Sequence, residues 1–254
     1  ATLKTSVPFM NFFDGFRTSH EYQKIECLTQ DDIRPLVDES DIKRFRDRAL
    51  SPERPTTRGT AENPETFFTH REACNEYYDR IPEIVEDYLG KISKITGREY
   101  HLFSYYGAED ADRMIILMGS ATEAAREAID YLNGKGEKVG MISVHLYRPF
   151  SVKHLLASVP KTVKRIAVLD RTKEPGAEGE PLYLDVKSAY YDVEDRPLIV
   201  GGRYGLGSND TTPMHIISVF DNLKLTMPKN HFTVGIVDDV TFTSLPLLEE
   251  LPLG

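Results

Sequence analysis

The chain has 254 residues, of which 40% are hydrophobic and 28% charged, a balance typical of a packed globular protein and not of a disordered one. Its 40 acidic and 31 basic side chains give a formal net charge of −9, which argues against nucleic acid binding because that function needs a basic face. No apolar run approaches the roughly 20 residues that cross a bilayer, so we expect no membrane segment. The two cysteines, Cys27 and Cys74, exclude a disulfide-rich scaffold and a cysteine-ligated cluster in this stretch, and they fit a cytoplasmic protein.

The first ninety-odd residues show no regular alternation of strands and helices. Residues 7–16 (VPFMNFFDGF) are aromatic and strand-like, and residues 30–48 predict a charged helix or a pair of turns. Residues 51–64 contain three prolines and a glycine, which predicts a long loop. Residues 67–95 have a helical pattern that Pro82 could interrupt. With too few strands for a sheet of its own, this part is expected to be the end of a domain that starts outside the chain.

From about residue 100, short apolar runs alternate with helical patterns. Pro181 and Pro213 each follow a polar residue and mark helix starts. Nearly continuous apolar strands separated by helices predict an α/β fold, with a mostly parallel sheet covered on both faces. The expected strands are 102–106, 113–118, 139–146, 165–169, 198–201 and 232–237, and the expected helices are 121–132, 151–158, 180–191 and 212–223.

Two loops lie where the carboxyl edge of such a sheet binds ligands. Residues 201–209 (GGRYGLGSN) are rich in glycine, but Asp210 stands where a dinucleotide-binding motif has its third glycine, and no phosphate-binding Lys-Ser/Thr pair follows. We interpret these glycines mainly as structural. In residues 171–181 (RTKEPGAEGEP), Lys173 and Glu174 could serve a site, pair with each other, or pair with a neighbouring domain.

Other motifs of catalysis or metal binding are missing from the sequence. The seven histidines have no metal-ligand spacing, and neither cysteine has a catalytic signature around it. Adjacent carboxylates such as Glu109-Asp110 and Asp238-Asp239 are typical of solvated faces in an acidic chain. The residues alone therefore predict an α/β protein with no self-contained active site, with no catalytic residue and no metal ligand.

Five strings, in order along the chain, resemble pyruvate:ferredoxin (flavodoxin) oxidoreductase. That family consists of much longer chains, so the resemblance implies an internal fragment. The start at Ala1 in place of Met is expected of a chain that is either processed or cut from a longer one. The strings are residues 5–21 (TSVPFMNFFDGFRTSHE), 44–64 (RFRDRALSPERPTTRGTAENP), 146–151 (LYRPFS), 160–186 (PKTVKRIAVLDRTKEPGAEGEPLYLDV) and 201–213 (GGRYGLGSNDTTP).

The resemblance implies three parts. Residues 1–95 would be the end of the first, thiamine diphosphate-binding domain and a linker. Residues 96–230 would be a second domain like the C-terminal domain of transketolases: three layers, α/β/α, with a mixed five-stranded sheet whose first strand is antiparallel to the rest. Residues 231–254 would start a third domain.

For function, the resemblance implies an enzyme that oxidatively decarboxylates pyruvate with coenzyme A to acetyl-CoA, carbon dioxide and reduced ferredoxin or flavodoxin. Its cofactors would be thiamine diphosphate, Mg²⁺ and [4Fe-4S] clusters. Its partners would be the other domains of the same chain, a second subunit of a homodimer, and ferredoxin or flavodoxin, which would bind other domains. A related 2-oxoacid:ferredoxin oxidoreductase is the alternative.

The fragment itself is expected to be a non-catalytic structural and interdomain module without a cofactor of its own. The alternative is a module that contacts coenzyme A, chiefly through Asp239, Thr241, Thr243 and Ser244 in the string 238–244 (DDVTFTS), with residues 171–173 as a further candidate contact. Backbone N–H groups and hydroxyls suit a phosphate, although the two aspartates would repel one.

A chain cut inside a domain exposes apolar surface that its missing part would cover. We expect Phe9, Phe12, Phe13 and Phe16 to form such a surface, and this region to be poorly ordered, repacked or buried against a second copy. The loop 51–64, with Arg54 and Arg58, is expected to be either a strap to another subunit or a solvated loop.

Overall fold

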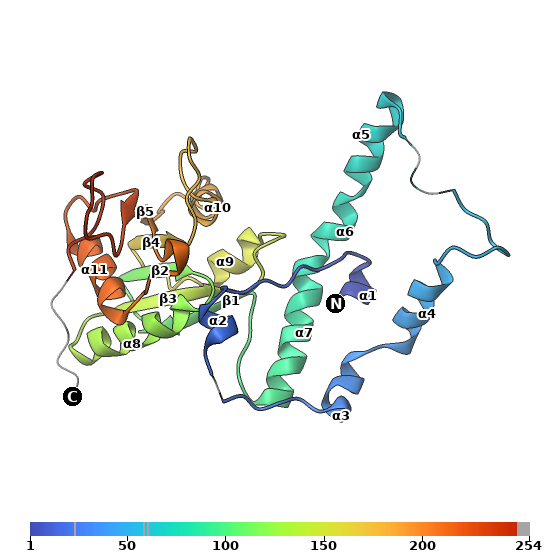
Figure 1. Cartoon of the computed structure of the whole chain (residues 1–254), viewed down its shortest axis with the longest axis horizontal. Coiled ribbons are helices and arrows are strands. Elements are labelled where there is room, and N and C mark those ends of the chain that lie inside the picture. The colour runs from blue at the N-terminus through green and yellow to red at the C-terminus, as the bar shows by residue number, and fades with distance from the viewer. Residues whose placement is uncertain (23, 58, 60, 248–254) are drawn as a thin grey trace. The chain divides into compact units, whose positions relative to one another are not determined.

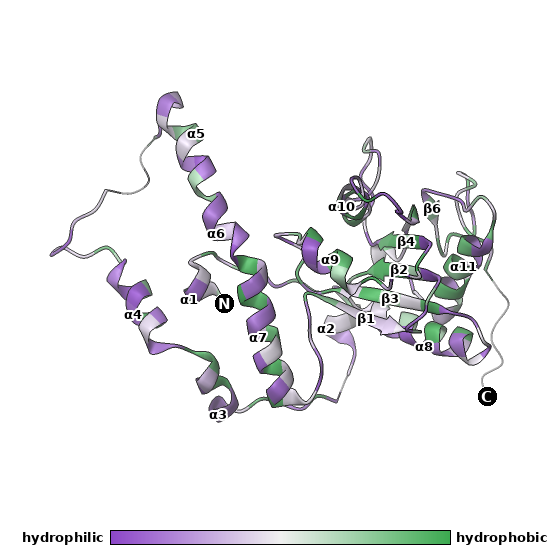
Figure 2. Cartoon of the chain, turned by 180° about the vertical axis from the view of Figure 1, so that it is seen from behind, coloured by the Kyte–Doolittle hydropathy of each residue, from purple (hydrophilic) through white to green (hydrophobic). Residues whose placement is uncertain are grey.

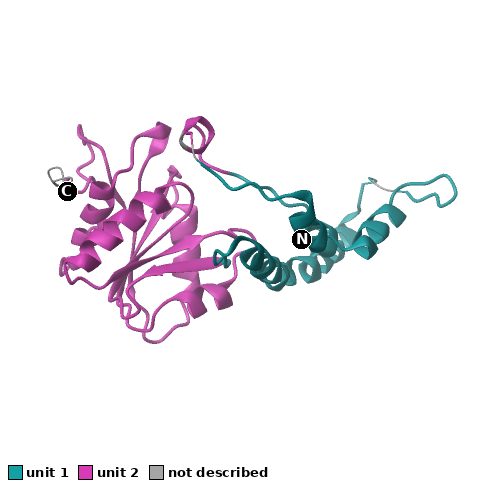
Figure 3. Ribbon diagram, turned by 90° about the horizontal axis from the view of Figure 1, so that it is seen from below, with its two compact units in different colours: residues 1–12, 23–102 teal, residues 13–22, 103–254 magenta. Residues whose placement is uncertain are grey.

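The computed structural model describes residues 1–22, 24–57, 59 and 61–247. By its contacts the chain divides into two compact units, residues 1–12 with 23–102 and residues 13–22 with 103–254 (Figure 3). Within the described residues, no helix is long and apolar enough to cross a membrane.

The first unit is helical in its described part (Figure 1). Its longest helix, α7, starts at Ile81 with Pro82 in its first turn, where a missing N–H costs nothing. It ends at Thr96, and Gly97 caps it with a left-handed φ of 71°. The helical pattern predicted over 67–95 is therefore divided just before Pro82, as expected, and again at Cys74. The elements of this unit are α1 (Thr2–Thr5), α3 (Gln30–Ile33), η1 (Arg34–Leu36), α4 (Glu39–Asp47), α5 (Pro64–Ala73), α6 (Asn75–Asp79) and α7 (Ile81–Thr96).

The strand-like reading of residues 7–16 is wrong. Residues 6–14 have no regular secondary structure, and a turn at residues 15–16 leads into the short helix α2 (Arg17–His20) of the second unit. An extended aromatic segment becomes a strand only when another strand pairs with it, and this segment has no such pairing.

Its aromatic side chains are exposed, as expected: Phe9 by 40%, Phe12 by 62%, Phe13 by 64% and Phe16 by 65%. The loop that follows α4 is irregular apart from a bridge between Ser51 and Arg54, and Arg58 lies outside the described residues.

The second unit contains a mixed sheet in the order β1-β3-β2-β4-β5-β6. Strand β1 is antiparallel to β3, and the remaining pairs are parallel. The apolar runs of β2, β3 and β4 are buried on both faces, and Figure 2 shows the hydrophobic residues concentrated there. The strands are β1 (Phe103–Gly107), β2 (Arg113–Leu117), β3 (Val139–Val144), β4 (Arg165–Asp170), β5 (Leu198–Arg203) and β6 (Phe232–Thr233).

The α/β class and the antiparallel first strand agree with expectation, but the sheet has six strands and not five. The extra strand, β6, pairs with β5 through only Gly202–Phe232 and Arg203–Thr233. The chain then turns away at Gly235, whose φ is 86°, so the strand predicted over 232–237 is short. Phe232 is fully buried, which fixes this short pairing to the core.

Helices cover both faces of the sheet. Helices α8 and α11 pack on each other and share one apolar core with β2, β3 and β4, while α10 packs against β4 and β5, and α9 against β1. The glycine pair Gly201-Gly202 leaves room for two rings, because a Cβ on Gly201 would lie 2.8 Å from the Tyr183 ring of α10 and one on Gly202 would lie 2.1 Å from the Phe232 ring of β6. The helices are α8 (Ala121–Gly134), α9 (Val152–Ser158), α10 (Pro181–Ala189) and α11 (Pro213–Lys224), with the 3-10 turn η2 (Leu206–Ser208).

Candidate site at the carboxyl edge of the sheet

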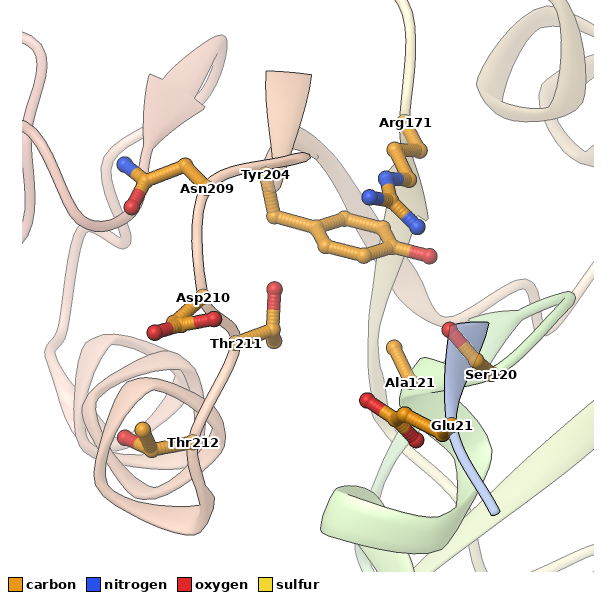
Figure 4. A pocket seen from close by; sticks show the side chains of 9 residues that line it. All are labelled: Glu21, Ser120, Ala121, Arg171, Tyr204, Asn209, Asp210, Thr211 and Thr212. Atoms are coloured by element: carbon orange, nitrogen blue, oxygen red, sulfur yellow. The ribbon is translucent and has the colours of Figure 1, made fainter. Parts of the chain in front are cut away.

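The neighbouring strands β2 and β4 lead to helices on different faces of the sheet, α8 and α10. In open α/β sheets this arrangement opens a crevice at the carboxyl ends of the two strands, where ligands bind. The second unit has a cavity of about 270 Å³ at this place (Figure 4). The cavity is lined by Glu21, Ser120, Ala121, Arg171, Tyr204, Asn209, Asp210, Thr211 and Thr212.

A carboxylate of the chain itself binds at this crevice. Oδ2 of Asp14 accepts a hydrogen bond of 2.5 Å from the backbone N–H of Ser120, and Oδ1 lies 3.0 Å from Nη1 of Arg171. Burial alone would raise the pKa of Asp14, but the Ser120 hydrogen bond and the Arg171 charge bring that pKa below its ordinary value. Gly119 makes room, since its φ is +83° and a Cβ there would lie 2.6 Å from Oδ2 of Asp14.

Arg171 follows β4 directly and connects two loops. Its Nε donates to the carbonyl of Gly205 at 2.9 Å, beyond the end of β5, while its Nη1 reaches Asp14. The side chain is only 19% exposed, so its charge acts in a poorly hydrated place. The buried hydroxyl of Tyr204 donates to the carbonyl of Met118 at 3.2 Å, and burial raises its pKa. These bonds fasten the ends of β2, β4 and β5 to one another.

A second group of charges lies at the start of α10. Both oxygens of Asp170 accept backbone N–H groups, from Leu182 and from Tyr183, at 3.0 Å each. Burial raises the pKa of Asp170 to about 6 against the effect of these two bonds, and the nearby Glu180 charge adds to the rise.

Glu180 is itself 1% exposed, and two cations neutralise it. Nη1 of Arg203 lies 3.4 Å from Oε1 of Glu180, and Nζ of Lys173 lies 3.5 Å from the same oxygen. Lys173 also interacts with Glu174, as one of the expected alternatives had it, because its Nζ donates to the Glu174 backbone carbonyl at 3.1 Å. Its ion pair, however, is with the carboxylate of Glu180.

The four residues proposed to contact coenzyme A lie in one turn, apart from the crevice residues. Oδ1 of Asp239 accepts from the N–H and the hydroxyl of Thr241, at 3.1 and 2.8 Å, and Oδ2 accepts from the N–H of Ser244 at 2.6 Å. The Ser244 bond is the main reason that the pKa of Asp239 is lowered. The Thr243 hydroxyl lies 2.8 Å from that of Thr241. Asp239 thus already occupies N–H groups that a phosphate would need.

Sequence reasoning missed most of the residues at the crevice. Ser120 and Arg171 each follow an apolar run, and that position is the available signal for them. Asp14 lies 106 positions before Ser120, and no spacing rule connects residues that far apart. Among the residues that the structure describes, no group of three or more His, Cys, Asp or Glu could hold a metal ion.

The fold is that of an α/β unit with a ligand-type crevice, joined in sequence to a helical unit. Two family models match successive parts of the chain. Residues 1–89 match "Pyruvate flavodoxin/ferredoxin oxidoreductase, thiamine diP-bdg", and residues 111–216 match "Pyruvate:ferredoxin oxidoreductase core domain II". The chain belongs to the pyruvate:ferredoxin (flavodoxin) oxidoreductase family.

Curated relatives agree with this assignment. The chain is 62% identical over 245 residues to the pyruvate-flavodoxin oxidoreductase of Enterobacter agglomerans, and 56% identical over 251 residues to the pyruvate:ferredoxin oxidoreductase of Moorella thermoacetica. These alignments cover 96% and 99% of this chain but 21% of each relative, so the chain spans about a fifth of their length.

A solved 2-oxoglutarate:ferredoxin oxidoreductase from Magnetococcus marinus is also similar, with a TM-score of 0.39 and 20% identity. The similarity covers 64% of this chain and 24% of that one. A likeness of this size does not bear on function.

Proposed function

We propose that the chain is part of an enzyme that oxidatively decarboxylates pyruvate with coenzyme A, giving acetyl-CoA, carbon dioxide and reduced ferredoxin or flavodoxin. The high identity to enzymes with these names supports the proposal. The whole enzyme would use thiamine diphosphate, Mg²⁺ and [4Fe-4S] clusters, and it would act as a homodimer in the cytoplasm. Within it, residues 1–95 would end the first domain, 96–230 form the second, and 231–254 start the third, whose residues 248–254 lie outside the described part.

Within that enzyme, we assign this stretch a structural and interdomain role. The observation that carries this assignment is the pairing of polar groups at the carboxyl edge of the sheet. Asp14 occupies both the Ser120 N–H and the Arg171 guanidinium, and Glu180 is paired with Arg203. Groups that satisfy one another in this way stabilise a fold but are not available to a substrate.

The described residues of the first unit do not form a site that fits thiamine diphosphate. They form no sheet, and only Thr5, Val7, Asp41, Ile81 and Leu102 are buried among them. The buried Thr5 hydroxyl is already in use, since it accepts the N–H of Val7. We therefore assign the reaction chemistry to parts of the enzyme other than this chain.

Exposed aromatic residues of the first unit support the interdomain part of the proposal. Phe12, Phe67 and Phe68 are 62%, 53% and 72% exposed, which is unfavourable in water and favourable against another apolar surface. We propose that the remaining domains, or the second subunit of the dimer, cover these side chains.

Contact with coenzyme A is the second candidate function. The turn of Asp239, Thr241, Thr243 and Ser244 supports it by placing two threonine hydroxyls side by side, with the ammonium of Lys229 3.2 Å from the carbonyl of Phe242 in the same turn. The Asp239 carboxylate opposes it, because its charge repels a phosphate and its oxygens hold the N–H groups.

A thermal-unfolding titration of the chain separates the two roles. A ligand present at 100 times its dissociation constant stabilises the native state by about 2.7 kcal/mol, which raises the midpoint of a chain of this size by about 5–10 °C. A structural module shows no shift with coenzyme A or with thiamine diphosphate. The second candidate, contact with coenzyme A, would replace the structural role under two conditions. Coenzyme A would have to raise the midpoint, and Asp239→Asn would have to change the size of this rise while the exposed control Asp192→Asn left it unchanged.

The proposal for the whole enzyme has its own test. The full-length protein should reduce a one-electron dye only when both pyruvate and coenzyme A are present. Reduction with another 2-oxoacid and not with pyruvate would assign it to a related 2-oxoacid:ferredoxin oxidoreductase.

A further inference from the structure

Residues 13–22 belong to the second unit, although the chain on both sides of them belongs to the first. We name these residues the 13–22 segment. It contributes Asp14, the short helix α2, and Glu21, which lines the crevice cavity. The segment therefore has contacts of its own with the carboxyl edge of the sheet in the second unit.

The hydrogen bonds inside the segment are local. The Ser19 hydroxyl accepts the N–H of Phe16 at 3.0 Å and lies 2.7 Å from Nδ1 of His20, whose ring stacks on Phe16. Phe13 and Phe16 are about two-thirds exposed, at 64% and 65%, so they bury little apolar surface against the second unit. The contact of Asp14 with Ser120 and Arg171 is therefore a charged link between the segment and the carboxyl edge of the sheet.

That contact has the features of a carboxylate-binding site. One oxygen of Asp14 faces the Ser120 N–H, which precedes the 14-residue helix α8, and the other faces Arg171. Each donor is prepared independently: Gly119 leaves room for the carboxylate, and the Gly205 carbonyl orients Arg171 through Nε. Charge-assisted bonds of this kind are about twice as strong as neutral ones.

We propose that the Ser120 N–H and the Arg171 guanidinium form a carboxylate-binding site whose occupant is Asp14, and that this occupancy fastens the 13–22 segment into the crevice. The segment is then a strap held by an exchangeable ligand. A small carboxylate in solution can take the place of the Asp14 side chain once that side chain is removed, because the two donors stay where the sheet holds them. This inference concerns how the chain holds itself together and does not depend on the proposed enzyme activity.

Peptide-resolved hydrogen exchange on the full-length protein tests the proposal. In Asp14→Ala we expect exchange of the 13–22 segment and of the Ser120 amide to become at least about tenfold faster, because two charge-assisted bonds are lost. Peptides from β2 and β4 should keep their protection, which shows that the variant is folded. Asp14→Asn keeps an acceptor for the Ser120 N–H but loses the charge, so the exchange rate of its 13–22 segment should lie between those of the wild type and Asp14→Ala. Asp192→Ala, at an exposed carboxylate, is the matched control and should not change the segment.

Rescue with formate separates a carboxylate-binding site from a general loss of packing. Added to Asp14→Ala, formate should slow exchange at Ser120 in a concentration-dependent manner, while chloride at the same ionic strength should not. In Arg171→Ala the segment should also open, but formate should have no effect because the cation is missing. The proposal is overturned if Asp14→Ala leaves the segment protected, or if formate and chloride act alike.

Discussion

The raised pKa of Asp170 predicts that the stability of the second unit falls between about pH 4 and pH 8. This carboxyl is 3% exposed, and its pKa is raised from its ordinary value of 3.8 to about 6. The folded protein therefore holds the Asp170 proton at a pH where the unfolded chain has lost it. The resulting stabilisation is complete below the unfolded pKa, and it is lost as the pH rises through the folded one.

The shift of about two pKa units sets the size of this effect. One unit corresponds to about 1.4 kcal/mol, so the ionised carboxylate lowers the free energy of unfolding by about 3 kcal/mol at high pH. Between about pH 4 and pH 8 the change is about 2–3 kcal/mol, since the unfolded chain is already partly ionised at the lower limit. The Leu182 and Tyr183 N–H groups reduce the cost of ionising the buried Asp170 because they bind the charged carboxylate, whereas the neighbouring Glu180 charge increases that cost.

Asp170→Asn measures this contribution, because it removes the charge and keeps the size. The amide of the variant has one oxygen in place of two, so one of the two backbone N–H groups loses its acceptor. This loss lowers the free energy of unfolding by about 1–3 kcal/mol, an amount that does not depend on pH. Urea denaturation of both proteins, followed by circular dichroism from about pH 4 to pH 8, should show the variant gaining about 2–3 kcal/mol on the wild type. Other titrating groups, such as Asp14, are present in both proteins and cancel in the comparison. Parallel curves over this range would refute the reasoning.

Three further substitutions test the crevice and the sheet. Gly119→Ala should lower the free energy of unfolding by about 1–3 kcal/mol, because its φ is +83° and its new Cβ would lie 2.6 Å from Asp14, while Gly134→Ala, with open space around it, should not. Gly202→Ala should lower the urea midpoint by displacing the Phe232 ring and breaking the β5–β6 pairing, and an unchanged midpoint would show that β6 is not needed. Arg171→Lys, which loses the bond to Gly205, should speed hydrogen exchange of residues 205–208.

The sheet could be predicted from the sequence because its central strands are buried on both sides. Residues 114–118 and 166–169 are unbroken apolar runs, which is typical of strands in a covered parallel sheet. Pro181 and Pro213 mark the helix starts that the structure has. Edge elements were harder to predict. Strand β6 has two residues and depends on a ring contact, which leaves no periodic pattern.

The wrong strand prediction at residues 7–16 and the failure to predict the Asp14 contact have the same cause, because both depend on contacts that local sequence does not reveal. The aromatic residues there have the composition of a strand, but strand formation depends on a partner that local sequence does not reveal. Asp14 belongs to this misread segment, and its role comes from the Ser120 and Arg171 donors, which are 106 and 157 positions away by residue number. Arg171 could be placed at the correct edge of the sheet by its position after β4, but its partner could not be identified.

The charges around the crevice explain why its resemblance to a phosphate site is misleading. Of the nine residues that line the cavity, Arg171 is the cation, whereas Glu21 and Asp210 are acidic. Arg171 is moreover already neutralised by Asp14 at 3.0 Å. A phosphate would therefore have to displace Asp14 and then face two further carboxylates, both of which repel it. The glycine-rich loop 201–209 contributes the Gly205 carbonyl that orients Arg171, and Gly202 leaves space for Phe232. Gly202 is thus accounted for by packing and the Gly205 carbonyl by its support of Arg171, and the ligand that this edge of the sheet holds is a carboxylate of the chain itself.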